Sequence, residues 1–225
     1  RAAIELHPDY SVVVSNFPLR WQGKTLGELD LVIEQHSTGK CFHLELTCKF
    51  YLQIPDRNDF TQWMGPGQAD RLDKKLARLQ THQLTLLEDS RVQQVLYDRH
   101  WPAMNSYCVI KGRLFKPLTL NGSHANDFSD QEDALSTVNT DAISGYWVTR
   151  KQMSDVFSLE QYRWYELSKP EWFSTPELNN GSELSEIVNE NISRPKQMVG
   201  YCEQKKLCEQ QKEVVRIFLV EDDWV

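Results

Sequence analysis

Residues 40–52, KCFHLELTCKFYL, place two kinds of side chain on opposite faces of a predicted strand. Alternate positions give an apolar row and a polar row: Phe42, Leu44, Leu46, Cys48, Phe50 and Leu52, against His43, Glu45, Thr47, Lys49 and Tyr51. Successive side chains of a strand point to opposite faces, so Glu45 and Lys49 share one face. This face therefore carries a carboxylate, a hydroxyl and an ammonium group in one row, from Glu45, Thr47 and Lys49.

A second carboxylate comes from residues 26–33, LGELDLVI, where Glu28 and Asp30 share a face. The intervening HSTGK is a short turn, so the two strands are predicted to form an antiparallel hairpin. If the apolar faces of both strands meet the core on the same side, Asp30 and Glu45 become cross-strand neighbours. Such neighbours lie about 5 Å apart when they are directly opposite.

Two carboxylates at this separation repel each other unless a positive charge lies between them. Oxygen ligands of this kind suit Mg²⁺ or Mn²⁺, with water and substrate phosphate completing the coordination. A nearby lysine would then stabilise charge while a phosphodiester bond breaks. The same alternation is also typical of an antiparallel sheet whose polar face is simply solvated, and the pattern alone leaves both interpretations open.

Residues 70–87, DRLDKKLARLQTHQLTLL, form the clearest predicted helix, with Asp70 as its N-cap. Its basic residues are Arg71, Lys74, Lys75 and Arg78. A basic helix beside a metal site could bind the phosphate backbone of nucleic acid. The alternative is an ordinary solvated face, on which Asp70 or Asp73 pairs with the basic side chains.

The totals favour one domain in a reducing compartment. The 225 residues are 40% hydrophobic, which is enough for one sizeable core. Five cysteines without a CxxC pair indicate no disulfide framework and favour the cytoplasm. No apolar run approaches the roughly 20 residues of a membrane helix, and the formal charge of −7 does not by itself suggest nucleic-acid binding.

Further strands are predicted at residues 10–20, 107–115, 146–149, 197–202 and 213–220. Residues 120–142 are polar and acidic and are predicted to be a long loop, while the aromatic segment 162–176 shows no clear period. A polar stretch before residue 213 is expected to be helical. Strands and helices mix along the chain, so the fold class is α/β or α+β.

The order of several segments resembles an uncharacterised bacterial family, the domain of unknown function numbered 1853. The segments are GELD (27–30), HLELTCKFYL (43–52), GPGQADRLDKKLARL (65–79), KGRLF (111–115), GYW (145–147) and RIFLVEDDW (216–224). That family is similar to the PD-(D/E)XK nuclease-like superfamily. The resemblance implies an α/β fold whose central mixed sheet is flanked by helices, with a restriction-endonuclease-like core. It also implies one nuclease-like domain over residues 1–225, lacking most of an N-terminal helix of which Glu5 would be the remnant.

Carried onto this chain, the resemblance makes Asp30, Glu45 and the carbonyl group of Leu46 the ligands of Mg²⁺ or Mn²⁺. Glu45 and Lys49 become the catalytic residues, although the superfamily's lysine usually occupies the place of Thr47, one strand step of about 6–7 Å earlier. The implied activity is metal-dependent hydrolysis of phosphodiester bonds in nucleic acid. The alternative is an inactive nuclease-like fold that serves as a nucleic-acid-binding or protein-interaction module.

Overall fold

The structure is a computed structural model that describes residues 2–55, 59–118, 138–157, 162–174, 181–189, 192–202 and 215–224. Most of the predicted polar loop, and the stretch before residue 213 that was expected to be helical, lie outside these residues. The chain divides into two compact units, Arg1–Lys49 with Lys74–Lys111 and Phe50–Asp73 with Gly112–Val225. Within the described residues no helix has the length and apolarity that crossing a membrane requires.

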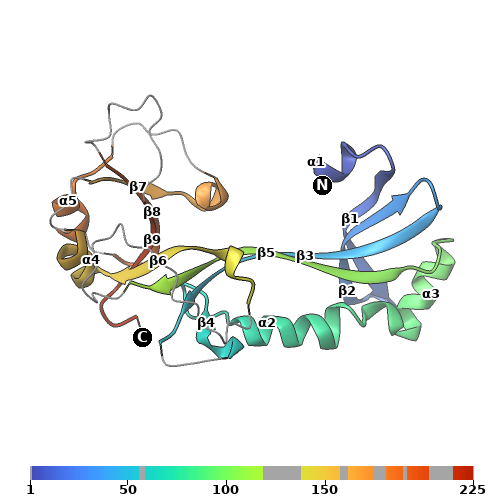
Figure 1. Cartoon of the computed structure of the whole chain (residues 1–225). Helices are drawn as coiled ribbons and strands as arrows, with labels where there is room; N and C mark the ends of the chain where they lie inside the picture. The colour runs from blue at the N-terminus through green and yellow to red at the C-terminus, as the bar shows by residue number, and fades with distance from the viewer. Residues whose placement is uncertain are drawn as a thin grey trace. The chain divides into compact units, whose positions relative to one another are not determined.

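The first unit combines strands in the order β1-β2-β3-β5 with short helical segments (Figure 1). Its elements are α1 (Ala2–Glu5), β1 (Tyr10–Trp21), β2 (Lys24–Gln35), β3 (Lys40–Gln53, to Lys49), α2 (Leu72–Arg78, from Lys74), η2 (Leu79–Gln83), η3 (Leu86–Glu88), α3 (Ser90–Asp98) and β5 (Asn105–Pro117, to Lys111). The strands β1, β2 and β3 are antiparallel neighbours, as the short turns between them predict.

Local sequence explains the turns and the helix of this unit. Gln22 and Gly23, between β1 and β2, both have positive φ angles of 46° and 77°, as a two-residue hairpin turn requires. Asp89 caps α3 by accepting a hydrogen bond from the backbone N–H of Arg91 at 2.8 Å. The core of the unit contains Leu19, Leu29, Val32, Val92 and Leu96.

The face of β3 that is buried in this unit differs from the expectation. The polar residues His43, Glu45 and Thr47 are buried, whereas Leu46 is 42% exposed. The reason is that the segment of α2 and η2 lies against the polar face, where Gln83 donates a hydrogen bond to Glu45 and accepts one from Lys75. A singly exposed leucine, by contrast, is common on protein surfaces.

The second unit carries strands in the order β5-β6-β9-β8-β7, and β4 pairs with the end of β3. Its further elements are η1 (Phe60–Gln62), β4 (Trp63–Met64), η4 (Thr140–Ala142), β6 (Ile143–Thr149), α4 (Arg150–Phe157), β7 (Tyr162–Leu167), η5 (Lys169–Phe173), α5 (Leu184–Asn189), β8 (Lys196–Cys202) and β9 (Val215–Val220). The pairs β5–β6 and β6–β9 are parallel, while β9–β8 and β8–β7 are antiparallel. The predicted α/β class with a mixed sheet flanked by helices is therefore confirmed.

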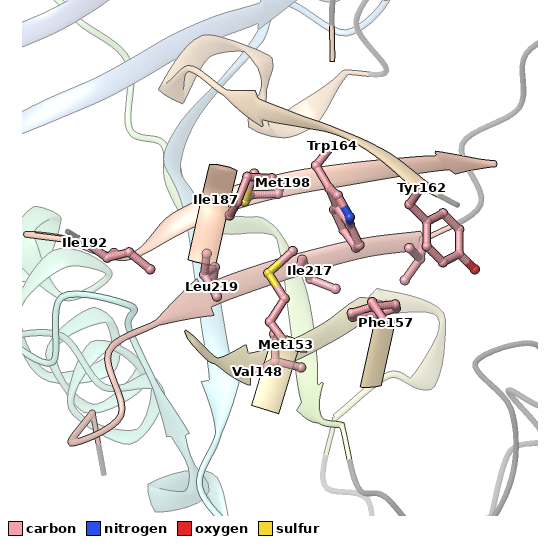
Figure 2. Close-up of a cluster of buried hydrophobic side chains, with 11 residues drawn as sticks. Val148, Met153, Phe157, Tyr162, Trp164, Ile187, Ile192, Met198, Ile217 and Leu219 are labelled. Carbon is pink, nitrogen blue, oxygen red and sulfur yellow. The ribbon is translucent and has the colours of Figure 1, made fainter. Parts of the chain in front are cut away.

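The core of the second unit lies between its strands and the helices α4 and α5. Figure 2 shows Met153 and Phe157 of α4, one helical turn apart, beside Ile217 and Trp164 of the sheet. Every residue of β9 is buried, which matches its nearly continuous apolar run and its place inside the sheet. The unpredicted strand β7 contributes Trp164 to this core.

Candidate functional site

Asp30 and Glu45 meet across the hairpin of β2 and β3. The paired register ends at Leu31 opposite Leu44, so the next position places Asp30 opposite Glu45. Their carboxyl groups are close enough to share a hydrogen bond, an interaction that requires a proton on one of them. The structure therefore brings together the two acids that the alternation of the strands predicted.

Asp30 is held by the backbone of β3. Its Oδ2 accepts a hydrogen bond from the backbone N–H of Leu46 at 2.9 Å, just beyond the last paired residues. The N–H and C=O of one strand residue point to the same edge, so the carbonyl group of Leu46 is directed towards β2 as well. All three predicted metal ligands, Asp30, Glu45 and the Leu46 carbonyl, thus belong to one short stretch of the hairpin.

Glu45 is the most perturbed acid of the site. Glu45 is only 2% exposed, and this burial is the main cause that raises its pKa to about 7. The negative charge of Asp30 raises this pKa further, while the positive charge of Lys75 and a hydrogen bond from Gln83 lower it. Glu45 therefore exchanges its proton near neutral pH, which is the range in which enzymes tune a catalytic carboxyl group.

The partners of Glu45 come from the helical segment that was predicted over residues 70–87. Gln83 donates a hydrogen bond from Nε2 to Oε1 of Glu45, and its own Oε1 accepts one from Nζ of Lys75 at 3.1 Å. Lys75 thus belongs to the acid pair as a nearby positive charge. The sequence pattern had instead predicted Lys75 as part of a basic face that could bind nucleic acid.

The helical segment is less regular than its apolar spacing predicts. The α-helix covers only Leu72–Arg78 and begins two residues after Asp70. It continues into the wide π turn η2, whose backbone bond joins the N–H of Leu84 to the carbonyl group of Leu79 at 2.9 Å. A π turn rotates less per residue than an α-helix, so it returns Gln83 to the face of Lys75, and such turns are frequent at functional sites.

His43 lies behind the acid pair and is completely buried. Its Nδ1 lies 3.0 Å from Oγ of Ser106 on β5, and its Nε2 lies 3.7 Å from Oε2 of Glu45. Burial lowers the pKa of His43, so the imidazole is neutral at physiological pH. Within the described residues Nε2 has no hydrogen-bond partner. This atom lies beside the carboxyl group of Glu45.

The predicted lysine, Lys49, lies further along β3. It is half-buried and stands four residues beyond Glu45, or about 13 Å along a strand. Thr47, the position at which the resemblance would place a lysine, is only 9% exposed. The lysine whose charge acts on Glu45 is Lys75, which comes from the helical segment.

The predicted basic face is divided by the structure. Arg71 forms an ion pair with Asp73 at 2.6 Å, as the alternative interpretation of this face expected, and both belong to the second unit. Lys74 and Arg78 belong to the first unit and are exposed, while Lys75 is turned towards Gln83 and Glu45.

A pocket of about 730 Å³ opens beside the acid pair in the first unit. Its lining comes from β2, from the α2–η2 segment and from Leu86: Leu26, Gly27, Glu28, Asp30, Ala77, Arg78, Thr81, His82, Gln83 and Leu86. Asp30 and Gln83, which both contact Glu45, are part of this lining. A ligand in the pocket would therefore reach Asp30, and it would lie one residue away from Glu45.

The residues present fit a hard divalent cation. In the described part of the chain no three side chains of His, Cys, Asp or Glu are grouped to hold an ion by themselves. Mg²⁺, however, is commonly bound through one or two carboxylates, with water and substrate phosphate as the other ligands. The charge of Asp30 is, after burial, the second cause of the raised pKa of Glu45, and a cation would relieve this repulsion.

Sequence reasoning missed His43, Gln83 and Ser106 as parts of the site. Nothing in the local pattern distinguishes Gln83 from other polar residues of a helix, because only the π turn brings it to Glu45. His43 does stand in the polar row of β3, and that row was the available signal.

Comparison with known proteins identifies the family of the chain. No curated protein and no solved structure matches it. A family model described as a domain of unknown function (DUF1853) matches residues 1–220, which is nearly the whole chain. The chain therefore belongs to this family, as its segments predict.

Proposed function

We propose that the protein hydrolyses phosphodiester bonds of nucleic acid with a divalent cation, Mg²⁺ or Mn²⁺, at Asp30 and Glu45. The observation that carries this proposal is the carboxyl pair, in which the buried Glu45 has a pKa of about 7 and Lys75 supplies the neighbouring positive charge. Acids on adjacent strands of a mixed sheet also support a restriction-endonuclease-like core.

Each residue of the site has a distinct part in this proposal. Asp30, Glu45 and the Leu46 carbonyl would hold the cation, which when bound polarises the phosphate and activates water. Lys75 stabilises the negative charge that develops on the phosphate, and Gln83 keeps its ammonium group in place. Lys49, on the same strand as Glu45, remains the second candidate for this charge-stabilising part.

Nucleic acid would reach the site along the exposed basic residues of the first unit. Lys74 and Arg78 are both exposed on α2, whereas Arg71 is already paired with Asp73. Local basic residues are needed because the formal charge of the chain is −7. The free thiol groups of Cys41, Cys48 and Cys108 support a reducing compartment such as the cytoplasm.

Cleavage assays test this proposal directly. Labelled DNA and RNA, single- and double-stranded, are incubated with the protein and Mg²⁺ or Mn²⁺, and with EDTA as the metal-free control. We expect metal-dependent cleavage that Asp30→Asn and Glu45→Gln each abolish. Glu34→Gln removes a half-buried carboxylate of the same hairpin outside the pair and should leave cleavage unchanged. Equal cleavage by all the variants would refute the proposed site.

A second candidate function is a non-catalytic nuclease-like module that binds nucleic acid or protein. It is favoured by the hydrogen bonds of Glu45, which accepts from Gln83 and shares a hydrogen bond with Asp30, because these protein groups already satisfy the carboxyl group. A protein that cuts none of the four substrates, and whose melting temperature does not respond to Mn²⁺, would support this module.

A further inference from the structure

The pocket beside the acid pair has the dimensions of a ligand site. Its volume of about 730 Å³ lies within the range of about 300–1,000 Å³ that is usual for small-molecule pockets. One wall is β2 and the other is the end of α2 with the π turn η2. Both walls belong to the first unit, so the pocket is formed by one compact part of the chain.

The helical wall carries an arginine and a histidine, which are side chains that can donate hydrogen bonds to phosphate. Arg78 and His82 are four residues apart, and both line the pocket. A guanidinium group offers planar, bidentate hydrogen bonds to phosphate oxygens, and an imidazole ring can donate a further one. The hydroxyl group of Thr81 is committed to the carbonyl oxygen of Ala77 at 2.9 Å, which leaves Arg78 and His82 as the donors of this wall.

Another part of the pocket is apolar. Leu26 and Leu86 line it together with Gly27. Leu86 packs directly over Gly27, because a Cβ atom at position 27 would lie only 2.8 Å from a methyl group of Leu86. This close approach provides an apolar surface against which the flat face of a nucleobase can pack.

One acid of the pair, Asp30, lies at the same pocket. Asp30 is in its lining, and Gln83 lies in the lining while its amide group contacts Glu45. A phosphate group bound by Arg78 would therefore lie in the cavity that Asp30 also enters. Glu28, the other acid of the lining, can accept hydrogen bonds from the hydroxyl groups of a sugar.

We infer that this pocket binds one nucleotide of a single strand, with its phosphate on Arg78 and His82 and its base on Leu26 and Leu86. The inference rests on the proposed function for its substrate class, and it adds a selection for unpaired nucleotides. A nucleotide inside a double helix is stacked and paired, so it cannot enter a pocket without leaving the helix. An unpaired or extruded nucleotide can enter, as in enzymes that act on a single base.

Binding without metal tests the inference separately from cleavage. Thymidine 5′-monophosphate, a short single-stranded thymidine oligonucleotide and a blunt DNA duplex are titrated into the full chain in EDTA. We expect the monophosphate and the single-stranded oligonucleotide to bind. The duplex should bind at least tenfold more weakly than the oligonucleotide. Arg78→Gln should weaken binding of the monophosphate at least tenfold.

The matched control removes a positive charge elsewhere in the same unit. Lys40 is exposed at the start of β3, at the far end of the hairpin from Asp30, so Lys40→Gln should change the affinity less than twofold. Equal losses in Arg78→Gln and Lys40→Gln, or equal affinity for duplex and single strand, would overturn the inference. So would a lack of monophosphate binding by the wild-type chain.

The outcomes separate this inference from the proposed function. Monophosphate binding that depends on Arg78, in a protein that cuts nothing, supports the pocket and refutes the nuclease. Metal-dependent cleavage that Asp30→Asn abolishes, with equal rates on single and double strands and no binding of the monophosphate, supports the nuclease and refutes the pocket.

Discussion

The amide group of Gln83 donates a hydrogen bond through Nε2 to Oε1 of Glu45. The donor comes from a π turn and the acceptor from a buried position of β3, so the contact fixes the helical segment to the acid pair. Since Gln83 also accepts a hydrogen bond from Lys75, a single amide group positions both the buried acid and the nearby cation.

Removal of this amide group should destabilise the protein. In Gln83→Met, Oε1 of Glu45 loses its donor inside the fold, and a buried unsatisfied polar group costs about 1–3 kcal/mol of unfolding free energy. Urea denaturation at neutral pH measures the loss. Gln80→Met changes an exposed glutamine of the same turn and should change the free energy by less than about 0.5 kcal/mol. Equal effects of the two substitutions would show that the Gln83 contact does not stabilise the fold.

The stability of the metal-free protein should fall as the pH rises through the titration of Glu45. In the unfolded chain a glutamate titrates near 4.3, and in the folded chain Glu45 has a pKa of about 7. The folded state therefore holds the proton more tightly, and stability present below about pH 4.3 is lost between that pH and about 7. The loss should be on the order of 3 kcal/mol.

Glu45→Gln isolates this contribution. Glutamine resembles the protonated acid, because its Oε1 can still accept from Gln83 and its amide group can donate to Asp30. Urea denaturation across the pH range, in EDTA, should show wild type and variant nearly equal below pH 4.3. The variant should be more stable above pH 7. Parallel pH profiles would mean that Glu45 titrates in the same range in both states.

The two candidate lysines can be separated by cleavage rates. Lys75→Met keeps the length of the side chain and removes the charge beside Glu45, so cleavage should fall on the order of 10²-fold. Lys49→Met should lower the rate by a similar factor only if the lysine of the strand stabilises the transition state. Rates at saturating Mg²⁺, measured in single-turnover assays, decide between them. A large loss in Lys49→Met alone would transfer the charge-stabilising part to Lys49.

A side chain at Gly145 should disrupt the parallel pairing of the second unit. Its Cβ atom would lie 2.2 Å from the backbone oxygen of Arg216 on the neighbouring strand β9, and a backbone atom in a sheet cannot move aside locally. Overpacking of this kind costs about 1–3 kcal/mol or more. Gly145→Ala should therefore lower the melting temperature by several degrees. At Gly67 a Cβ atom would meet nothing within 4 Å, so Gly67→Ala is the control; an equal effect there would contradict the steric explanation.

The sequence alone determined the hairpin and the pairing of its acids. Alternation in residues 26–33 and 40–52 and the short turn between them specify two antiparallel strands, and strand geometry then places Asp30 opposite Glu45. These features depend on residues near one another in the chain, which is why the local pattern was sufficient. The strand β7 was missed, because its aromatic residues show no clear period and its pairing with β8 joins distant segments.

The tertiary structure decided which face of β3 is buried and which lysine accompanies the acids. Alternation shows that Glu45 and Leu46 lie on opposite faces, but only the packing of the helical segment makes Glu45 buried and Leu46 exposed. Apolar spacing likewise predicted a continuous helix, whereas the π turn brings Gln83 to Glu45 and to Lys75. The physical reason is that burial and side-chain contacts depend on elements far apart in the chain, whose hydrogen bonds and desolvation determine the pKa of Glu45.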